Sequence, residues 1–146
     1  MMKSYRALFV LLATLLTIIA GGCEKSEGEG GNSSISGRII EQDMLALCSD
    51  EIEAEYPVAE QRVYIIYGDE SEVYHDDMRT DFDGRYKFRW LRPGTYTIFV
   101  ISECSTCDDE TGQDCLDSGG QNTIKKSVTI DKREDALLDD MIIQNY

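Results

Sequence analysis

The sequence predicts an all-β fold, a single seven-stranded antiparallel β-sandwich that follows an N-terminal export signal and a flexible linker. Short apolar runs and alternating apolar and polar residues recur from residue 35 to the C-terminus, with turn residues between them. No segment in that part sustains the 3.6-residue apolar period of an amphipathic helix. The length of 146 residues suits one domain. Two packed sheets would bury the apolar side chains of this pattern between them and leave the polar side chains exposed.

The expected strands follow from the apolar runs and from the turns between them. Residues 81–84 (DFDG) and 92–95 (RPGT) have turn composition, because Asp bonds its own backbone, Pro presets φ and Gly accepts positive φ. Residues 44–54, an acidic connection after the first strand, leave room for a short helix. The seven expected strands are residues 35–40, 62–67, 73–79, 85–91, 95–102, 123–130 and 138–144.

Residues 85–91 form the clearest of these strands. Tyr86, Phe88 and Trp90 alternate with Lys87 and Arg89, which predicts one aromatic face and one charged face. The runs at 62–67 and 95–102 are apolar at nearly every position. Strands of that kind are buried on both faces, so we expect these two at the centre of a sheet.

The N-terminus resembles a bacterial lipoprotein signal. Lys3 and Arg6 precede an uncharged apolar stretch, residues 7–20, that is short for a membrane-spanning helix, which needs about 20 residues. Two glycines then lead directly to Cys23. The resemblance implies a signal peptide over residues 1–22 and acylation of Cys23, which becomes the first residue of the mature protein. Several acyl chains together would anchor it stably to a membrane.

Residues 23–34 are expected to form a flexible acidic linker, because they contain no large apolar residue and are rich in Gly, Ser and Glu. Acidic residues directly after Cys23 also resemble the export signal of surface-exposed lipoproteins in some Gram-negative groups. Together with the signal peptide, this implies a lipid-anchored protein of the bacterial cell envelope, in the outer membrane.

The charge balance excludes one class of partner. The chain has 28 acidic and 14 basic residues, a formal net charge of −14. Binding to nucleic acid needs a surplus of Lys and Arg, and so does adsorption of a protein to anionic lipid headgroups. We therefore expect no nucleic-acid partner.

A family resemblance covers residues 34–145. It is carried by the segments TDFDGRYKF (80–88) and LRPGTY (91–96), after the opening SGRII (36–40) and PVAEQRVYI (57–65). This succession resembles the carboxypeptidase-regulatory-like domains, whose sandwich is transthyretin-like, collagen-adhesin B-type or more broadly Ig-like. The domain would occupy residues 35–146. The resemblance implies the fold more strongly than a function, since such sandwiches serve many roles. The chain is also loosely similar to lipoproteins encoded beside radical-SAM enzymes.

The sequence departs from that family at one functional position. Some collagen-adhesin B-type domains form a Lys–Asn isopeptide bond between the first and last strands. Here the first expected strand has Arg38 but no lysine, and the guanidinium cannot supply the nucleophilic amine. Asn145 near the C-terminus therefore has no partner for this reaction, and we expect no crosslink.

Four cysteines remain if Cys23 is acylated: Cys48, Cys104, Cys107 and Cys115. An even number in an exported chain predicts two disulfides. The preferred pairing is Cys48–Cys104 with Cys107–Cys115, and the main rival is Cys48–Cys115 with Cys104–Cys107. Two other interpretations are a four-thiolate zinc site and a redox function of the Cys104–Cys107 pair. The latter is disfavoured because acidic residues follow it and would raise the thiol pKa.

Carboxylate-rich segments suggest weak calcium binding as a further hypothesis. The candidate ligands are Asp81, Asp83, Asp108, Asp109 and Asp114. They lack the full EF-hand spacing, and the ordinary interpretation is turn chemistry together with a solvated acidic surface. No cofactor is expected.

Catalytic motifs are absent from the sequence. His75 is the single histidine, and we expect it to be an exposed strand residue, since no nucleophile elbow or metalloprotease motif accompanies it. Aromatic residues could form a carbohydrate-stacking surface, although at strand spacing core packing is the commoner role. These aromatics are Tyr64, Tyr67, Tyr74, Tyr86, Trp90 and Tyr96.

The sequence therefore predicts a non-enzymatic, lipid-anchored accessory or binding module whose partner is an envelope protein or a glycan. A calcium- or glycan-binding adhesion lipoprotein is the alternative. A thiol-redox protein that uses Cys104 and Cys107 is the third interpretation.

Overall fold

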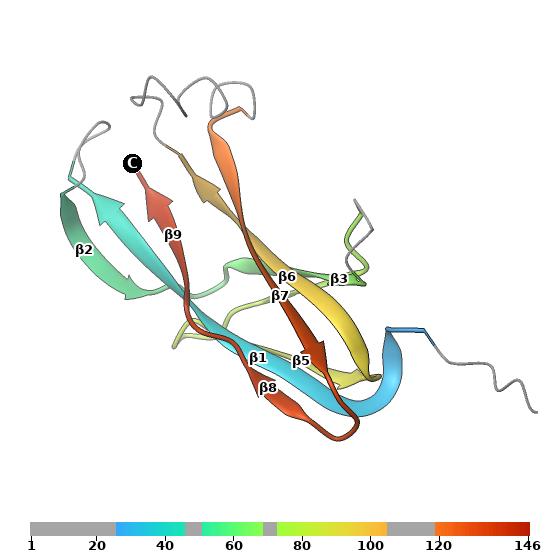
Figure 1. Cartoon of the computed structure of the whole chain (residues 1–146). Helices are drawn as coiled ribbons and strands as arrows, with labels where there is room; N and C mark the ends of the chain where they lie inside the picture. Colours follow the sequence, from blue (N-terminus) through green and yellow to red (C-terminus); the bar gives the residue numbers. More distant parts are fainter. Residues whose placement is uncertain (1–25, 46–50, 69–72, 105–118) are drawn as a thin grey trace, which may run out of the picture.

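The computed structural model describes residues 26–45, 51–68, 73–104 and 119–146, and in these residues it forms a two-sheet β-sandwich (Figure 1). The predicted all-β class is confirmed. The residues described include no helix that is long and apolar enough to cross a membrane. The strands are β1 (Glu29–Met44), β2 (Ile52–Pro57), β3 (Arg62–Tyr67), β4 (Asp76–Arg79), β5 (Arg85–Leu91), β6 (Gly94–Glu103), β7 (Gln121–Ile130), β8 (Asp135–Leu137) and β9 (Met141–Asn145).

The long strand β1 organises the first sheet. Its first half pairs antiparallel with β5, and its second half pairs antiparallel with β2. Strands β8 and β9 add to β1 in parallel. In this register Ser36 lies opposite Lys87 and Arg38 lies opposite Arg85. Directly opposite residues share a face of the sheet, so β1 and β5 present these four side chains together.

The second sheet is antiparallel throughout, in the order β4-β3-β6-β7. Tyr64 of β3 lies opposite Phe99 of β6, which in turn lies opposite Lys125 of β7. The expectation that residues 62–67 and 95–102 are central is confirmed, because β3 and β6 are the two inner strands of this sheet.

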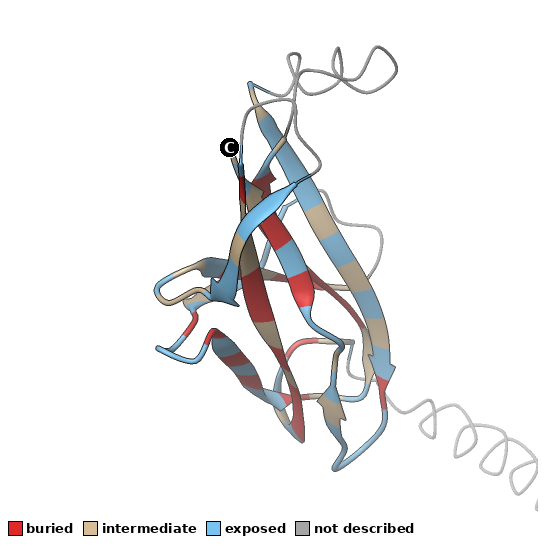
Figure 2. Ribbon diagram, turned by 90° about the vertical axis from the view of Figure 1, so that its left-hand side faces the viewer, coloured by how far each residue is buried: buried red, intermediate tan, exposed pale blue. Residues whose placement is uncertain are grey.

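The core lies between the sheets and follows the period-two alternation of the strands (Figure 2). Val63 and Ile65 of β3 and Ile98 of β6 are fully buried and face the first sheet's Ile35 and Ile39. On β5, Tyr86 and Phe88 are buried, whereas Lys87 and Arg89 are exposed. The predicted aromatic face is therefore correct for the first two aromatic residues of that strand.

Trp90 breaks the alternation that the sequence predicted. It is 68% exposed, and its φ of +61° lies in the left-handed region, which is unfavourable for a residue with a Cβ. The β1–β5 register shifts at the same point, because Glu29 and Ser33 are both partners of Leu91. This irregularity turns Trp90 outward and brings Leu91 into the core.

The structure corrects several other expectations. There are nine strands in the described residues, not seven, and two pairings are parallel. The first strand begins at Glu29, so the expected linker is wrong for residues 29–34, where Ser33 and Ser34 are buried. Residues 52–57 form β2, which rules out a helix there. The last expected strand, residues 138–144, is wrong for residues 138–140: β9 begins at Met141, and the additional strand β8 ends at Leu137.

Candidate functional site

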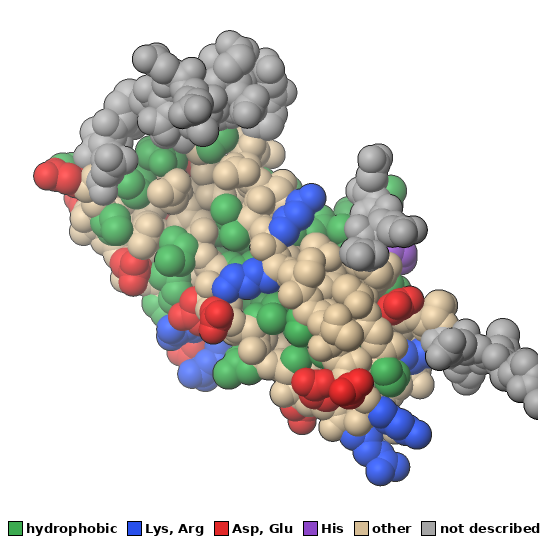
Figure 3. Space-filling model, viewed as in Figure 1, with side chains coloured by type: hydrophobic (Ala, Val, Ile, Leu, Met, Phe, Trp, Pro, Cys, Tyr) green, Lys and Arg blue, Asp and Glu red, His purple; other side chains and the backbone are tan. Residues whose placement is uncertain are grey.

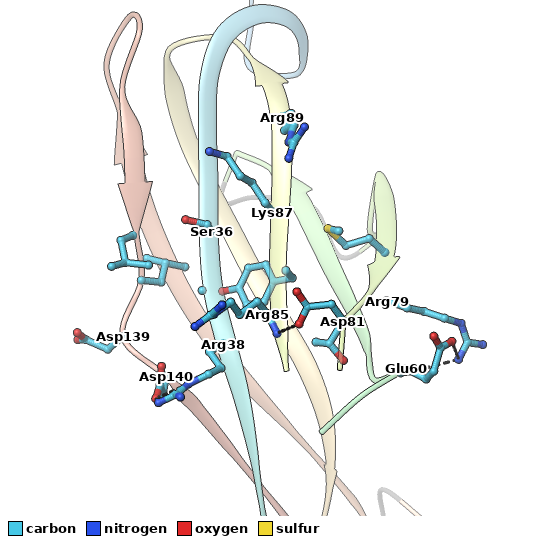
Figure 4. Close-up of a pocket in the computed structure, with 16 residues that line it drawn as sticks. Ser36, Arg38, Glu60, Arg79, Asp81, Arg85, Lys87, Arg89, Asp139 and Asp140 are labelled. Carbon is cyan, nitrogen blue, oxygen red and sulfur yellow. Dashed lines mark hydrogen bonds and ion pairs between the residues drawn. The ribbon is translucent and has the colours of Figure 1, made fainter. Parts of the chain in front are cut away.

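A broad groove runs beside β5 and has a volume of about 1210 Å³ (Figure 4). Its walls come from the first half of β1, β4 and the turn that follows it, β5 itself and the segment that joins β8 to β9. The lining residues are Ser36, Gly37, Arg38, Glu60, Met78, Arg79, Thr80, Asp81, Arg85, Tyr86, Lys87, Arg89, Leu137, Leu138, Asp139 and Asp140.

Five cationic and four acidic side chains line this groove. Figure 4 shows Arg38 with Asp140 on one side and Arg79 with Glu60 on the other, while Lys87 and Arg89 extend along β5. On a chain with a net charge of −14, the groove is thus a region without acidic surplus.

Two ion pairs flank the groove. Nη2 of Arg38 lies 2.5 Å from the Asp140 carboxylate, and Nε of the same guanidinium donates to it at 3.1 Å. On the other side, Nη1 of Arg79 lies 3.7 Å from the Glu60 carboxylate and donates to the Glu60 carbonyl at 2.9 Å. All four side chains are well exposed, so these pairs add little stability but orient the guanidinium groups.

The β4–β5 turn is built by Asp81. Its carboxylate accepts the backbone N–H of Asp83 at 2.9 Å and that of Arg85 at 2.8 Å. Asp83 in turn forms an exposed ion pair with Arg85 at 3.4 Å. The two acids therefore perform the turn chemistry expected of them.

The described residues contain no group of three or more His, Cys, Asp or Glu that could hold a metal ion. The other calcium candidates, Asp108, Asp109 and Asp114, lie outside the residues described. Calcium binding by them stays a prediction.

Thr80 fastens the β4–β5 turn to the connection between β2 and β3. It is buried, its hydroxyl donates to the Val58 carbonyl at 2.6 Å, and the same oxygen accepts the Gln61 N–H at 3.0 Å. These bonds fix the chain on both sides of Glu60, whose φ is +60°. The position of the Glu60–Arg79 pair is thus set by a buried hydroxyl.

Tyr86 carries a polar group with no hydrogen bond. The residue is 2% exposed, and its hydroxyl is buried without a hydrogen-bond partner among the described residues. Burial, and to a smaller extent the Asp140 charge, raise the pKa of this phenol above its usual range. The hydroxyl lies against Gly37, where an added Cβ would overlap it.

Trp90 lies at the end of β5 beyond Lys87 and Arg89. These three side chains line a smaller hollow with Asn32, Ser33, Ser34 and Asp135. Asp135 accepts the hydroxyl of Ser34 and lies 3.4 Å from the Lys87 ammonium. The hydrogen bond from Ser34, followed by the Lys87 charge, lowers the pKa of Asp135.

The aromatic residues considered from the sequence do not form one surface. Tyr86 and Tyr96 are buried. Tyr64 stacks on Phe99 with ring centroids 4.7 Å apart, and Tyr74 meets Tyr64 edge-on at 4.9 Å. Trp90 stands apart from that cluster, since it lines the hollow beside β5.

His75 directly precedes β4 and is exposed. Its ring stacks on Tyr67 with centroids 4.7 Å apart, and its Nδ1 accepts the Tyr67 N–H at 3.1 Å. The imidazole therefore has a local structural role at the end of β3.

The first and last strands, β1 and β9, are neighbours. Asn145 lies opposite Asp43 and donates from its amide to the Asp43 carboxylate at 3.1 Å. Arg38, farther along β1, is paired with Asp140. In this arrangement the Asn145 amide faces an acid on β1.

Of the cysteines, only Cys104 lies in the described residues. It follows β6, and its N–H donates to the Gly120 carbonyl at 3.2 Å. Cys23, Cys48, Cys107 and Cys115 lie outside the described part of the chain. Both pairings proposed from the sequence stay predictions, as does the acylation of Cys23.

The sequence did not identify the groove, although part of its signal was visible. Lys87 and Arg89 occupy the charged face predicted for residues 85–91. The opposition of Arg38 to Arg85 depends on the β1–β5 register, and the contribution of Asp140 depends on the parallel addition of β8 and β9. Neither can be deduced from local pattern.

Similarity to known proteins is found among solved structures. No protein-family model matches this chain, and no curated protein does either. Among solved structures, a Pseudomonas aeruginosa protein suggested to bind carbohydrate is similar, with 19% sequence identity and a TM-score of 0.46. The match covers 77% of this chain and 90% of that one.

Proposed function

We propose that this protein is a non-enzymatic binding module, held at a bacterial cell envelope by acyl chains on Cys23, and that its groove binds carbohydrate. The observation that carries the proposal is the groove beside β5, with its size and its mixture of cationic and acidic side chains. The groove is larger than the roughly 300–1,000 Å³ typical of small-molecule sites. It suits several linked sugar units better than a single small ligand.

The chemistry of the lining favours sugar hydroxyls. Each hydroxyl both donates and accepts hydrogen bonds, so a sugar needs donors and acceptors side by side. Guanidinium groups of Arg38 and Arg85 supply planar donors, and the carboxylate of Asp139 supplies acceptors within the same groove. Leu137, which is 80% exposed and lies opposite Ser36, offers an apolar patch for the C–H face of a ring.

The charge balance of the groove extends the range of ligands. Most acidic glycans would be repelled by a chain of net charge −14. Lys87 and Arg89 are exposed in the groove, and Arg89 makes no ion pair within the described residues. A neutral glycan could therefore bind in the groove, and the acidic group of a weakly acidic glycan could pair with one of these cations.

Binding is tested with the full chain in detergent micelles, first on a glycan array and then by calorimetric titration of the best ligand. Arg85→Ala should weaken binding by about tenfold, the effect of one charge-assisted hydrogen bond. The matched control is Arg62→Ala, since Arg62 is also an exposed arginine with one ion pair, at 3.6 Å to Asp77, and lies outside the groove. Equal affinities of the two variants, or no glycan ligand at all, would remove the assignment.

The anchor is tested separately by labelling cells with a palmitate analogue. Wild-type protein should incorporate the label and fractionate with membranes. Cys23→Ala should abolish both, because the thiol that accepts diacylglycerol is gone. Labelling that persists in Cys23→Ala would refute lipid attachment at this residue.

A further inference from the structure

We infer that the end of the sandwich nearest the anchor rests on the phospholipid headgroups of the membrane, with Trp90 at the membrane–water interface. This inference rests on the proposed acylation of Cys23. Its supports are the short chain between Cys23 and the first fixed residues, and the side chains gathered at that end of the domain.

The chain leaves little freedom between the anchor and the domain. The Gly28 N–H donates to the Tyr96 hydroxyl at 2.9 Å, and the Gly28 carbonyl accepts the Arg92 N–H at 2.8 Å. The Ser26 carbonyl accepts from the Arg92 guanidinium at 3.3 Å. Cys23 is three residues before Ser26, so even a fully extended chain spans only about 11 Å between them.

The tether end of the sandwich, defined as residues 26–28, the β5–β6 turn and the β7–β8 turn, must therefore stay close to the lipid. Figure 1 shows the start of β1 and the β7–β8 turn at the same end of the molecule. Ser33 joins them, because its hydroxyl donates to the Asp131 carbonyl at 2.7 Å. In Figure 3, Lys and Arg side chains gather beside the point where the chain leaves toward its N-terminus.

Trp90 has the properties of an interfacial residue. It is 68% exposed at the end of β5, two residues from Arg92, and it shares a hollow with Ser33 and Asp135. An indole has a large apolar body and one N–H donor, and tryptophan concentrates at membrane interfaces for that reason. The left-handed backbone at Trp90 costs free energy, and a residue held outward at such a cost is often a functional one.

Charges at the tether end permit contact with phospholipid. Lys132 and Arg133 are exposed in the β7–β8 turn and can approach phosphate groups. Of the acids of this end, the Glu134 carboxylate accepts the Asp131 N–H at 2.5 Å and Glu27 lies beside Gly94, while the exposed Asp131 offsets one of the two cations.

The anchor also compensates for the net charge. Without an anchor, a chain of net charge −14 would not adsorb to an anionic surface. A lipid at Cys23 keeps the tether end within a few ångströms of the headgroups, so the contact forms at high effective concentration and need not be strong.

The test uses Trp90 as reporter, since it is the only tryptophan in the chain. The acylated full chain is reconstituted into vesicles of phosphatidylethanolamine and phosphatidylglycerol, and flotation with the vesicles verifies the anchor. Trp90 fluorescence is then quenched either by nitroxide-labelled phospholipid or by acrylamide in the water. We expect strong quenching by the lipid probe, weak quenching by acrylamide and emission at shorter wavelength.

Lys132→Glu should at least halve the quenching by the lipid probe, because a carboxylate replaces a cation facing phosphate. The control is Lys125→Glu, which makes the same charge change on the exposed side of β7, opposite Phe99. Equal losses in both variants would refute contact through the tether end.

Two further outcomes separate the proposals. Protein that floats with vesicles while Trp90 remains open to acrylamide and untouched by the lipid probe would overturn the docking and leave the anchor intact. Protein that neither floats nor carries palmitate would overturn the anchor, and the docking with it.

Discussion

The hydroxyl of Tyr96 holds the amide of Gly28, 68 residues away in the sequence, at 2.9 Å. The same hydroxyl donates to the Arg92 carbonyl at 2.8 Å. Tyr96 is fully buried, and burial is the main cause that raises the pKa of its phenol. One side chain therefore closes the N-terminal segment onto the β5–β6 turn, and the domain begins earlier than its apolar pattern indicates.

Tyr96→Phe should lower the free energy of unfolding by about 1–3 kcal/mol, because the Gly28 N–H loses its partner in a buried site. The measurement is urea denaturation of the full chain in detergent. Tyr67→Phe is the control, since its ring packs edge-on against Tyr96 at 5.8 Å and is only half-buried. The interpretation fails if the control is as destabilising as Tyr96→Phe.

Gly37→Ala should destabilise the protein by about 1–3 kcal/mol, because overpacking forces neighbours to move. The added Cβ would overlap the Tyr86 hydroxyl, and both residues lie on paired strands with little room to shift. Thermal unfolding measures the loss. The double variant with Tyr86→Phe should recover part of it, and no recovery would mean that the hydroxyl is not the obstacle.

Tyr86→Phe alone should leave stability unchanged or raise it by up to about 1 kcal/mol, because it removes a buried hydroxyl that has no partner in the described residues. Urea denaturation midpoints of the two proteins provide the comparison. A clear loss of stability would show that this hydroxyl is hydrogen-bonded, for example through an ordered water.

The lowered pKa of Asp135 predicts a contribution to stability that depends on pH. A carboxyl whose pKa is depressed by folding stabilises the protein above the unfolded pKa of about 3.9. That contribution is lost as the pH falls through the lower pKa of the folded state. Asp135→Asn should therefore lower the stability of the protein at pH 6. On acidification below the unfolded pKa, the variant should lose less stability than wild type. Denaturation midpoints at pH 6 and at the acidic pH provide the comparison. Asp139→Asn, also exposed, should follow the wild-type profile.

The thiols offer a fifth test. Unreduced, denatured mature protein should show no free thiol at Cys48, Cys104, Cys107 and Cys115 when titrated with a thiol reagent. Peptide mapping then separates the pairing Cys48–Cys104 with Cys107–Cys115 from its rival. Two or more free thiols would contradict the two-disulfide prediction and favour the zinc or redox interpretations.

Local pattern was sufficient for most strands. Residues 62–67 and 85–91 coincide with β3 and β5, since their period-two or continuous apolar character fits a strand and nothing else of that length. Local pattern did not predict the strands that polar residues form by pairing with other strands. Residues 29–34 and 52–57 have little apolar character, yet both pair with other strands, because β1 and β5 supply the hydrogen bonds that their own side chains do not predict.

The sequence by itself determined the class of fold, the inward and outward faces of most strands and the address implied by Cys23, because each of these depends on residues close together in the chain. Only the tertiary structure decided that Trp90 turns outward, that Arg38 and Asp140 meet beside β5, and that Gly28 is held by Tyr96. These contacts depend on strand register and on a parallel addition to β1. Backbone hydrogen bonds between distant segments set the register and the parallel addition, and a local pattern of residues does not predict these bonds.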